Sequence, residues 1–210
     1  MPSLSGRKAP LRHRGGRRIG LLGGSFNPAH DGHRHISVQA LRRLGLDEVW
    51  WLVSPQNPLK PIAGMAPFAA RLASARAVAR HPRIRVTGIE AELGTTYTAE
   101  TLPRLLRRFP RLCFVWLMGA DNLIDIARWR DWTTIFRTVA IAVFDRPHYS
   151  LRALSCKAVR RFTKARLKES QASVLADRPP PAWVFLHTRR DATSATRIRA
   201  ERGSNPWARA

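Results

Sequence analysis

The stretch GGSFNPAHDGH (23–33) joins an apolar run, IGLL (19–22), to a segment with helical periodicity. This order predicts a tight turn between a buried strand and a helix. Gly23 and Gly24 let the backbone come close to a phosphate, and the N-terminal end of the following helix favours an anion. His30 and His33 lie three positions apart, so both imidazoles can point at the same phosphate oxygens.

The stretch matches neither of the common phosphate-binding fingerprints, because it has no GKS or GKT and no GxGxxG. Two histidines in a turn also occur as an exposed or structural pair, or as half of a metal site. The preceding strand, the two glycines, Pro28 and the helix start together favour phosphate binding over these alternatives.

Around this turn, apolar strand-like runs alternate with segments of helical periodicity five or six times. Such alternation predicts an α/β fold, a doubly wound parallel sheet with helices on both faces. Ligands of such sheets bind beyond the carboxyl ends of the strands. The expected strands are 19–26, 48–54, 83–90, 111–119, 139–147 and 182–188, and the expected helices are 33–45, 67–81, 96–109, 151–169 and 194–203.

The length of 210 residues suits one hydrophobic core, and we expect one domain over 19–203. Residues 1–18 are rich in Gly, Pro, Ser and Arg, which predicts a disordered basic extension, and 204–210 predict a short tail. The arginines of the expected helix 151–169 should face solvent.

The formal net charge of +23 is the strongest compositional signal. Clustered basic residues are typical of nucleic-acid binding. Here the basic residues are grouped at 7–18 and 152–168 but are also scattered through the chain, as expected of a protein that attracts small polyanions. We therefore do not expect nucleic acid as the main partner. No apolar run reaches the roughly 18–20 residues that cross a bilayer, and no secretory signal is recognisable. Cys113 and Cys156 have no metal-ligand spacing and are expected to be free thiols, which fits a cytoplasmic protein.

Two signatures at opposite ends of the chain resemble those of one superfamily. GSFNPAHDGH (24–33) is similar to the GSFxPxHxGH signature of the adenylyl- and cytidylyltransferases, and SATRIR (194–199) is similar to their second signature. The resemblance implies a Rossmann-like nucleotidyltransferase fold. PQNPLK (55–60), TYTAETL (96–102), GADNL (119–123) and DRP (145–147) further resemble the bacterial nicotinate-nucleotide adenylyltransferases. The chain departs from the pattern at Asn27, where Asp is common, and at Ala195, where many members have Ser.

The resemblance implies transfer of the adenylyl group of ATP to nicotinate mononucleotide, which gives deamido-NAD and pyrophosphate without a covalent enzyme intermediate. His30 and His33 would stabilise the charge that develops at the α-phosphorus. Mg²⁺ is the implied cofactor and is expected to arrive with ATP, with no metal site on the protein. The implied ATP-binding residues are Gly24, Ser25, Phe26, Gly119, Asp121, Ser194, Thr196 and Arg199, with the last three on the β- and γ-phosphates and Asp121 on a ribose hydroxyl.

For the second substrate, the resemblance implies that Lys60 meets the mononucleotide phosphate and that Thr98 bonds near the pyridine carboxylate. Trp129 would stack on the pyridine ring. Arg146 is either a phosphate contact or a surface salt-bridge partner. Tyr97 and Trp132 are expected to be structural.

Other functions stay open at this point. Phosphopantetheine adenylyltransferases typically have Thr where His30 stands and lack the TYTAETL element, and the small cytidylyltransferases lack this C-terminal pattern. Nicotinamide mononucleotide is harder to exclude as the acceptor, because backbone amides can distinguish a carboxylate from a carboxamide. A basic nucleic-acid-binding protein on the same fold would bind with strong salt dependence and turn over no ATP. The sequence also leaves open whether the chain forms a homo-oligomer.

Overall fold

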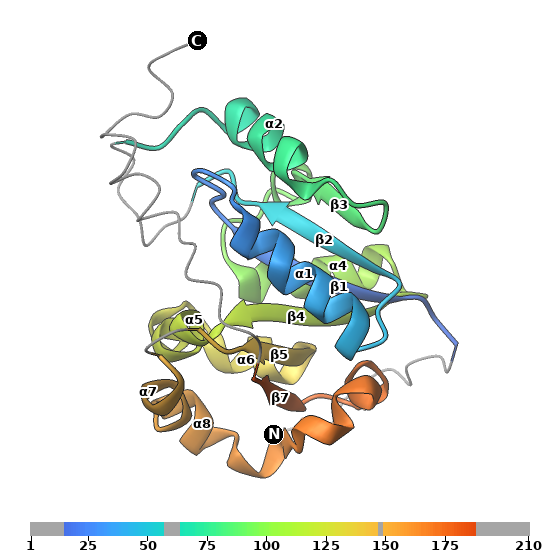
Figure 1. Ribbon diagram of the computed structural model, residues 1–210, viewed down its shortest axis with the longest axis vertical. Helices are drawn as coiled ribbons and strands as arrows, with labels where there is room; N and C mark the ends of the chain where they lie inside the picture. Colours follow the sequence, from blue (N-terminus) through green and yellow to red (C-terminus); the bar gives the residue numbers. More distant parts are fainter. Residues whose placement is uncertain (1–14, 57–63, 147–148, 188–210) are drawn as a thin grey trace, which may run out of the picture.

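A seven-stranded parallel sheet forms the centre of the molecule (Figure 1). The computed structural model describes residues 15–56, 64–146 and 149–187. The strand order is β3-β2-β1-β4-β5-β7-β6, and every neighbouring pair is parallel. The strands are β1 (Arg18–Gly24), β2 (Glu48–Val53), β3 (Ile84–Thr87), β4 (Cys113–Gly119), β5 (Ala140–Phe144), β6 (Arg166–Leu167) and β7 (Trp183–Leu186). The predicted doubly wound α/β fold is confirmed.

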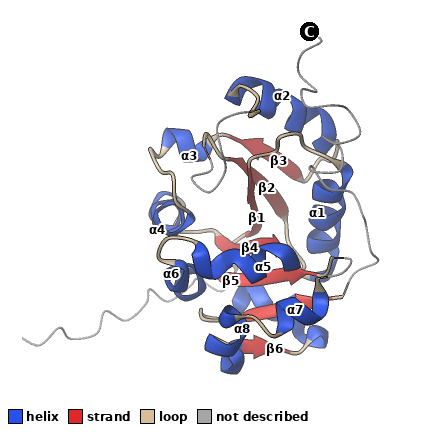
Figure 2. Cartoon of the chain, turned by 90° about the vertical axis from the view of Figure 1, so that its left-hand side faces the viewer, coloured by secondary structure: helices blue, strands red, loops and turns tan. Residues whose placement is uncertain are grey.

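Helices cover both faces of this sheet. Figure 2 shows α1 and α2 on one side and α3, α4 and α6 on the other. The helices are α1 (Asp31–Arg43), α2 (Phe68–Ala79), α3 (Ile89–Glu92), α4 (Thr98–Arg108), α5 (Ala120–Asp125), α6 (Trp132–Thr138), α7 (Ser150–Leu154) and α8 (Lys157–Arg161), with short 3-10 segments at Ile126–Arg128, Thr163–Ala165 and Glu169–Asp177.

The strands supply two hydrophobic cores, one on each face. Successive side chains of a strand point to opposite faces, so Trp50 packs with the core under α4 to α6, and Trp51 packs with the core under α1 and α2. The residues of β4 are buried throughout, as expected of a central parallel strand covered on both sides. This double burial explains why the strands form near-continuous apolar runs in the sequence.

The order of the strands reverses at β1. This strand pairs with β2 on one side and with β4 on the other, so the chain leaves β1 and β4 toward different faces of the sheet. A crevice opens at such a switch point, beyond the carboxyl ends of the two strands. The histidine-containing turn follows β1, and GADNL follows β4. The topology therefore brings the two motifs to the same crevice.

The predicted single helix over 151–169 is wrong. The chain forms α7, then α8, a 3-10 turn and the two-residue strand β6, because Cys156 takes an extended conformation between the two helices. The break lets Phe162 pack flat on Phe136, with ring centroids 4.3 Å apart, while Trp183 Nε1 donates to the Phe162 carbonyl. The expectation that the arginines face solvent is correct for Arg152, Arg160, Arg161 and Arg166.

The strands are in general shorter than expected, and two boundaries have a clear physical cause. Strand β1 begins at Arg18, which the sequence analysis placed in the basic extension, and its N–H donates to the Asp47 carboxylate. Strand β3 ends at Thr87 instead of continuing to residue 90, because the Thr87 hydroxyl accepts the N–H of Ile89 and starts α3. A Cβ on Gly88 would come within 2.9 Å of the Phe68 ring, so the chain turns tightly against α2 here. The predicted domain limits and the helix at 194–203 lie partly or wholly outside the described residues and stay predictions.

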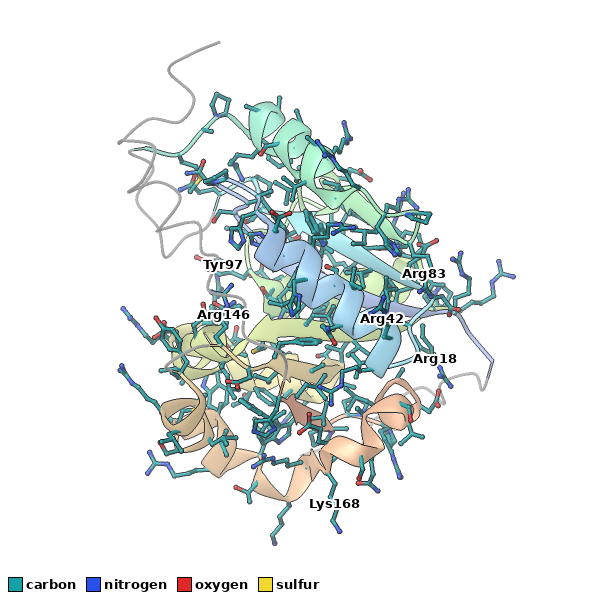
Figure 3. The ribbon with its side chains drawn as sticks, in the orientation of Figure 1. Arg18, Arg42, Arg83, Tyr97, Arg146 and Lys168 are labelled. Carbon is teal, nitrogen blue, oxygen red and sulfur yellow. The ribbon has the colours of Figure 1, made fainter. Side chains whose placement is uncertain are left out.

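Basic side chains project from several elements of the fold. In Figure 3, Arg18, Arg42 and Arg83 lie at one end of the sheet, away from Arg146 and Tyr97. Arg18 is held there by an ion pair with Asp177 at 2.8 Å. Among the described residues, no helix has both the length and the apolar character to cross a membrane.

Candidate active site

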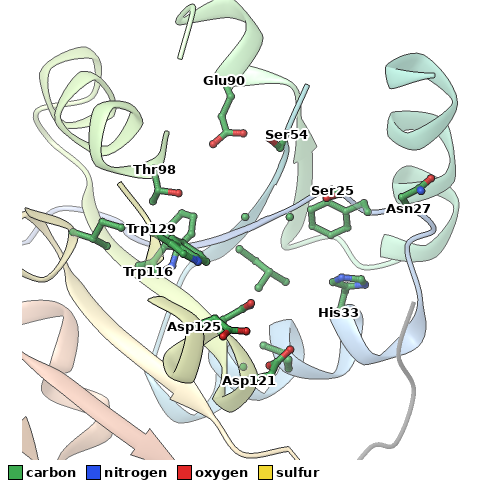
Figure 4. Close-up of a pocket in the computed structure, with 18 of the residues that line it drawn as sticks. Ser25, Asn27, His33, Ser54, Glu90, Thr98, Trp116, Asp121, Asp125 and Trp129 are labelled. Atoms are coloured by element: carbon green, nitrogen blue, oxygen red, sulfur yellow. The ribbon is translucent and has the colours of Figure 1, made fainter. Parts of the chain in front are cut away.

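A cavity of about 440 Å³ lies beyond the carboxyl ends of β1 and β4 (Figure 4). Its walls come from the turn after β1, the start of α1, the end of β2, α3, the turn before α4, the β4–α5 junction and the segment around Trp129. The volume is typical of small-molecule sites. The cavity brings together these predicted site residues: Gly24, Ser25, Phe26, His30, His33, Thr98, Gly119, Asp121, Trp129 and Arg146.

The turn after β1 is held in shape by Phe26. Its backbone is left-handed, with φ of 47°, a conformation that costs a non-glycine residue on the order of 1–2 kcal/mol. Burial of the ring offsets this cost, because Phe26 is 2% exposed and stacks on Trp51 with centroids 5.1 Å apart. The same ring lies 4.6 Å from the His33 ring. Phe26 thus fixes both the turn and the imidazole beside it.

The two histidines stand together at the start of α1. His30 is the N-cap residue, and the two ring centroids are 3.8 Å apart. His33 Nδ1 accepts the backbone N–H of His30 at 3.2 Å. An acceptor Nδ1 places the proton of a neutral imidazole on Nε2. His33 therefore offers an N–H donor on the ring atom that points away from the backbone, next to the positive end of a helix of 13 residues.

Asn27 ties the turn to the segment that precedes α2. Its amide nitrogen donates to the Gly64 carbonyl at 3.1 Å, and its amide oxygen accepts the Ala66 N–H at 3.1 Å. An aspartate could make only the second of these bonds, because a carboxylate has no donor. The amide at this position, which departs from the common pattern, therefore fits this chain.

Arg71 links the same turn to the loop after β2. Arg71 lies on α2, and its side chain is 1% exposed. It donates to the carbonyls of Ser25 at 2.8 Å, Ser54 at 2.6 Å, Pro55 at 2.7 Å and Ala66 at 3.0 Å. Burial lowers the pKa of the guanidinium, and these carbonyls take the place of water around it. One side chain thus sets the distance between two walls of the cavity.

The β4–α5 junction forms the opposite wall. Asp121 Oδ2 pairs with Arg146 at 3.2 Å, and both side chains are only partly exposed. A Cβ on Gly119 would collide with Asp121 Oδ1 and come within 3.0 Å of Arg146 Nε. A side chain at position 119 would therefore displace this ion pair from its present position.

Several polar atoms in the cavity walls have no hydrogen-bond partner among the described residues. They are Ser25 Oγ, Glu90 Oε2, Trp116 Nε1 and Asp121 Oδ1, and all four are buried. Buried polar atoms are normally paired, because an unpaired one costs about 1–3 kcal/mol. Their concentration in one cavity indicates a polar ligand that carries both donors and acceptors.

Comparison with known proteins agrees with this geometry. The family model described as cytidylyltransferase-like matches residues 21–201. A protein of Methylorubrum extorquens (strain PA1) named "Probable nicotinate-nucleotide adenylyltransferase" is 56% identical over 182 residues, which cover 87% of this chain and 98% of that protein. A protein of Cereibacter sphaeroides with the same name is 54% identical, covering 87% and 96%. The chain belongs to the nicotinate-nucleotide adenylyltransferase family.

A solved structure shares the fold of this adenylyltransferase family member. The nicotinic acid mononucleotide adenylyltransferase of Plasmodium falciparum, complexed with NaAD, superposes with a TM-score of 0.66 at 16% identity. The match covers 88% of this chain and 83% of that one. At this identity the likeness shows a shared fold alone.

Some of the predicted residues lie outside the described part of the chain, and the others have visible contacts. Lys60, Ser194, Thr196 and Arg199 lie outside the described residues, and their roles stay predictions. Arg146 makes the salt bridge that was one of its two expected roles, while a phosphate contact stays a prediction. Trp132 packs edge-on against Phe136 and Phe162, as expected of a structural residue.

Several residues of the cavity are not predicted by the sequence. Tyr97 was expected to be structural, yet it lines the cavity, with the Arg130 guanidinium 4.8 Å from its ring centre. Glu90 and Trp116 line it as well, and Arg71 supports it from behind. No local pattern singles out Glu90, which stands at the end of the expected strand 83–90 and two residues before Glu92. No local pattern distinguishes Trp116 or Arg71, because both act through contacts made across the fold.

The two glycines of the turn should respond differently to alanine. A Cβ on Gly23 would collide with the Trp116 ring, so Gly23→Ala is expected to cost about 1–3 kcal/mol of stability. A Cβ on Gly24 would meet nothing closer than the Phe26 ring at 3.5 Å, so Gly24→Ala should stay within about 0.5 kcal/mol of the parent. Because Gly24 lines the cavity, Gly24→Ala should instead raise the KM for ATP. Urea unfolding and ATP titration measure the two effects, and equal stability losses in both variants would contradict this assignment.

Glu90 should make stability depend on pH. Burial raises the pKa of Glu90 to about 7, and the Ser54 and Thr101 hydroxyls offset only part of this effect. Between pH 4.5 and 7 the folded protein keeps a proton that the unfolded chain releases, so stability falls as pH rises through this range. Glu90→Gln should therefore gain stability relative to the parent, by up to about 3 kcal/mol, between pH 5 and 8. Thermal melts across that pH range measure the stability difference, and Glu92→Gln, at an exposed position, is the control. A difference between Glu90→Gln and the parent that does not change with pH would contradict the prediction.

Proposed function

We infer that this chain transfers the adenylyl group of ATP to nicotinate mononucleotide and releases deamido-NAD and pyrophosphate. The observation that carries this inference is the His30–His33 pair at the start of α1, which faces a cavity whose other walls hold Trp129 and Thr98. The histidine pair would bind the phosphates of both nucleotides, and the aromatic side chain at the other end would bind the pyridine ring of the acceptor. The family membership supports the same reaction.

The reaction needs positioning and charge stabilisation more than it needs an acid or a base. An oxygen of the mononucleotide phosphate forms a bond to the α-phosphorus of ATP while the bond from that phosphorus to the β-phosphate oxygen breaks. The attacking phosphate is already ionised, so no strong general base is required. Negative charge develops on the oxygens of the α-phosphoryl group and on the leaving pyrophosphate.

The turn after β1 would meet that charge. His33 Nε2–H is aimed away from the helix backbone, and the helix N-terminus adds a fixed positive potential. The unpartnered Ser25 hydroxyl lies in the same wall and can donate to a phosphate oxygen. Ser194, Thr196 and Arg199 would hold the β- and γ-phosphates.

The β4–α5 junction would bind the adenosine. Asp121 Oδ1 is buried without a partner, while Oδ2 is held by Arg146, so the carboxylate presents one oriented acceptor to the cavity. A ribose hydroxyl is a suitable donor for it. Gly119 keeps the wall free of a side chain at the point where the nucleoside would approach.

The aromatic end of the cavity would bind the acceptor. Trp129 would stack on the pyridine ring, the Thr98 hydroxyl would bond to the pyridine substituent, and Lys60 would meet the phosphate. Arg146 pairs with Asp121 in the cavity wall, and its guanidinium would contact a phosphate of the substrates.

We propose that Mg²⁺ reaches the site with ATP. Within residues 15–56, 64–146 and 149–187, no group of three or more His, Cys, Asp or Glu side chains is placed to hold a metal ion. Mg²⁺ commonly binds through substrate phosphates and water with few protein ligands, so the donor set of this cavity fits an ion that the triphosphate supplies. When bound, the ion would neutralise charge on the leaving pyrophosphate.

Pyrophosphate release from ATP in the presence of different acceptors tests the function. We expect release with nicotinate mononucleotide well above that with phosphopantetheine or with no acceptor. Background rates with nicotinate mononucleotide, nicotinamide mononucleotide and phosphopantetheine alike would refute the enzymatic assignment.

A further inference from the structure

The carboxyl group of Glu90 is part of the cavity, and the reaction described above leaves it without a role. Glu90 lies on α3 and is 4% exposed. Oε1 is 3.5 Å from the Thr101 hydroxyl, whereas Oε2 has no partner among the described residues. A buried carboxyl oxygen without a partner in a cavity wall indicates a ligand group that bonds to it.

Neutral hydroxyls surround this carboxyl group. Ser54 approaches from the end of β2 and Thr101 from α4, and Thr101 is itself bonded to the Thr95 hydroxyl at 2.9 Å. No cation in the described part of the chain pairs with Glu90. Burial in this setting favours the protonated acid, in agreement with a pKa of about 7.

The ionisable groups on the neighbouring elements have other partners or lie on other walls. Arg71 on α2 donates to main-chain carbonyls, and Glu100 on α4 is 3.6 Å from Arg130. Glu92 on the same helix is exposed, and Arg104 donates to the Leu93 carbonyl. The other charged or titratable residues that line the cavity are His30, His33, Tyr97, Asp121, Asp125, Arg128, Arg130 and Arg146.

Glu90 lies at the acceptor end of the cavity. In Figure 4 it stands near Ser54, on the same side as Thr98, while His33 and Asp121 lie at the opposite side. Trp129 stands between Glu90 and Asp121 in this view. A pyridine ring beside Trp129 would therefore direct its substituent toward the wall that contains Glu90 and Thr98, and its phosphate toward the histidines.

We propose that Glu90, as a carboxylic acid, donates a hydrogen bond from Oε2 to the carboxylate of nicotinate mononucleotide and so selects the acid over the amide. This inference rests on the proposed function. An O–H donor to a carboxylate makes a short, charge-assisted bond. An ionised Glu90 would repel that carboxylate and would accept a bond from the NH₂ group of a carboxamide instead. The preference for acid over amide should therefore weaken as Glu90 loses its proton.

The test is the ratio of kcat/KM for nicotinate mononucleotide to that for nicotinamide mononucleotide, measured with the full-length protein from pH 5.5 to 8.5. The two substrates carry the same titrating phosphate, so its contribution cancels in the ratio. Because kcat/KM reports the free enzyme, we expect the ratio to fall at least about 10-fold with a midpoint near pH 7. The change should lie in KM, with kcat altered less than about 3-fold, because the bond is made equally in the ground and transition states.

Two variants separate this role from a structural one. Glu90→Gln keeps the shape and a fixed N–H donor, so its acid-to-amide ratio should stay level across the pH range. Glu92→Gln, on the exposed side of the same helix, should keep the pH dependence of the parent. A level ratio in the parent, or the same slope in Glu90→Gln, overturns the inference while turnover itself upholds the proposed function. If neither mononucleotide supports pyrophosphate release, the proposed function fails and this inference fails with it.

Discussion

His33→Ala is expected to lower kcat at least about 100-fold while the protein stays folded. His33 Nδ1 is occupied by the His30 N–H, so Nε2 is a donor of fixed orientation in the cavity. Removal of one preoriented donor to a developing oxyanion typically costs 10²–10³ in kcat, or about 3–4 kcal/mol. The loss of the Nδ1 contact at the helix start should cost no more than about 1 kcal/mol of stability. Single-turnover formation of the dinucleotide measures the chemical step.

His35→Ala is the matched control for this prediction. His35 is on the same helix, two residues further on, but it does not line the cavity. Its replacement should leave kcat within about 2-fold of the parent. Near-normal turnover in a folded His33→Ala protein would remove His33 from the mechanism.

Arg71→Ala is expected to be strongly destabilising. The guanidinium satisfies four main-chain carbonyls, which join the turn after β1, the loop after β2 and the start of α2. Its removal leaves four carbonyls without their donor, two of them in buried bonds, which should cost about 3 kcal/mol or more. Urea unfolding measures the loss as a lower midpoint at unchanged slope.

The surviving folded fraction of Arg71→Ala should also bind substrates poorly, because two cavity walls lose their common anchor. Arg71→Lys retains the charge but reaches fewer carbonyls, and it should lie between the parent and Arg71→Ala. Arg76→Ala, an exposed arginine on the same helix, should change stability by less than about 0.5 kcal/mol. If Arg71→Ala and Arg76→Ala unfold at the same urea concentration, Arg71 has no role as an anchor.

The sequence predicted the sheet well because its strands are buried on both faces and form apolar runs. It failed where the backbone follows contacts between distant segments. The end of β3 depends on the approach of Gly88 to Phe68, and the break after α7 depends on the packing of Phe162 on Phe136. Periodicity within a segment contains no information about either contact.

Part of the candidate site was also predictable from the sequence. The sequence predicts His33 and Asp121 as neighbours because their motifs follow β1 and β4, whose positions in the sheet bring them to the same cavity. Glu90, Trp116 and Arg71 were not found, because their importance comes from burial without a usual partner or from hydrogen bonds to other loops. These properties exist only in the folded chain.

The central claim is transfer of the adenylyl group to an oxygen of the mononucleotide phosphate, and the fate of that phosphate's oxygens tests it most directly. Nicotinate mononucleotide labelled with ¹⁸O in its phosphate is incubated with ATP, Mg²⁺ and the enzyme. The masses of the dinucleotide and of the pyrophosphate are then measured by mass spectrometry. The account predicts one dinucleotide per pyrophosphate, with all of the label in the dinucleotide and none in the pyrophosphate. Label in the pyrophosphate, or pyrophosphate released without a dinucleotide, would contradict the account.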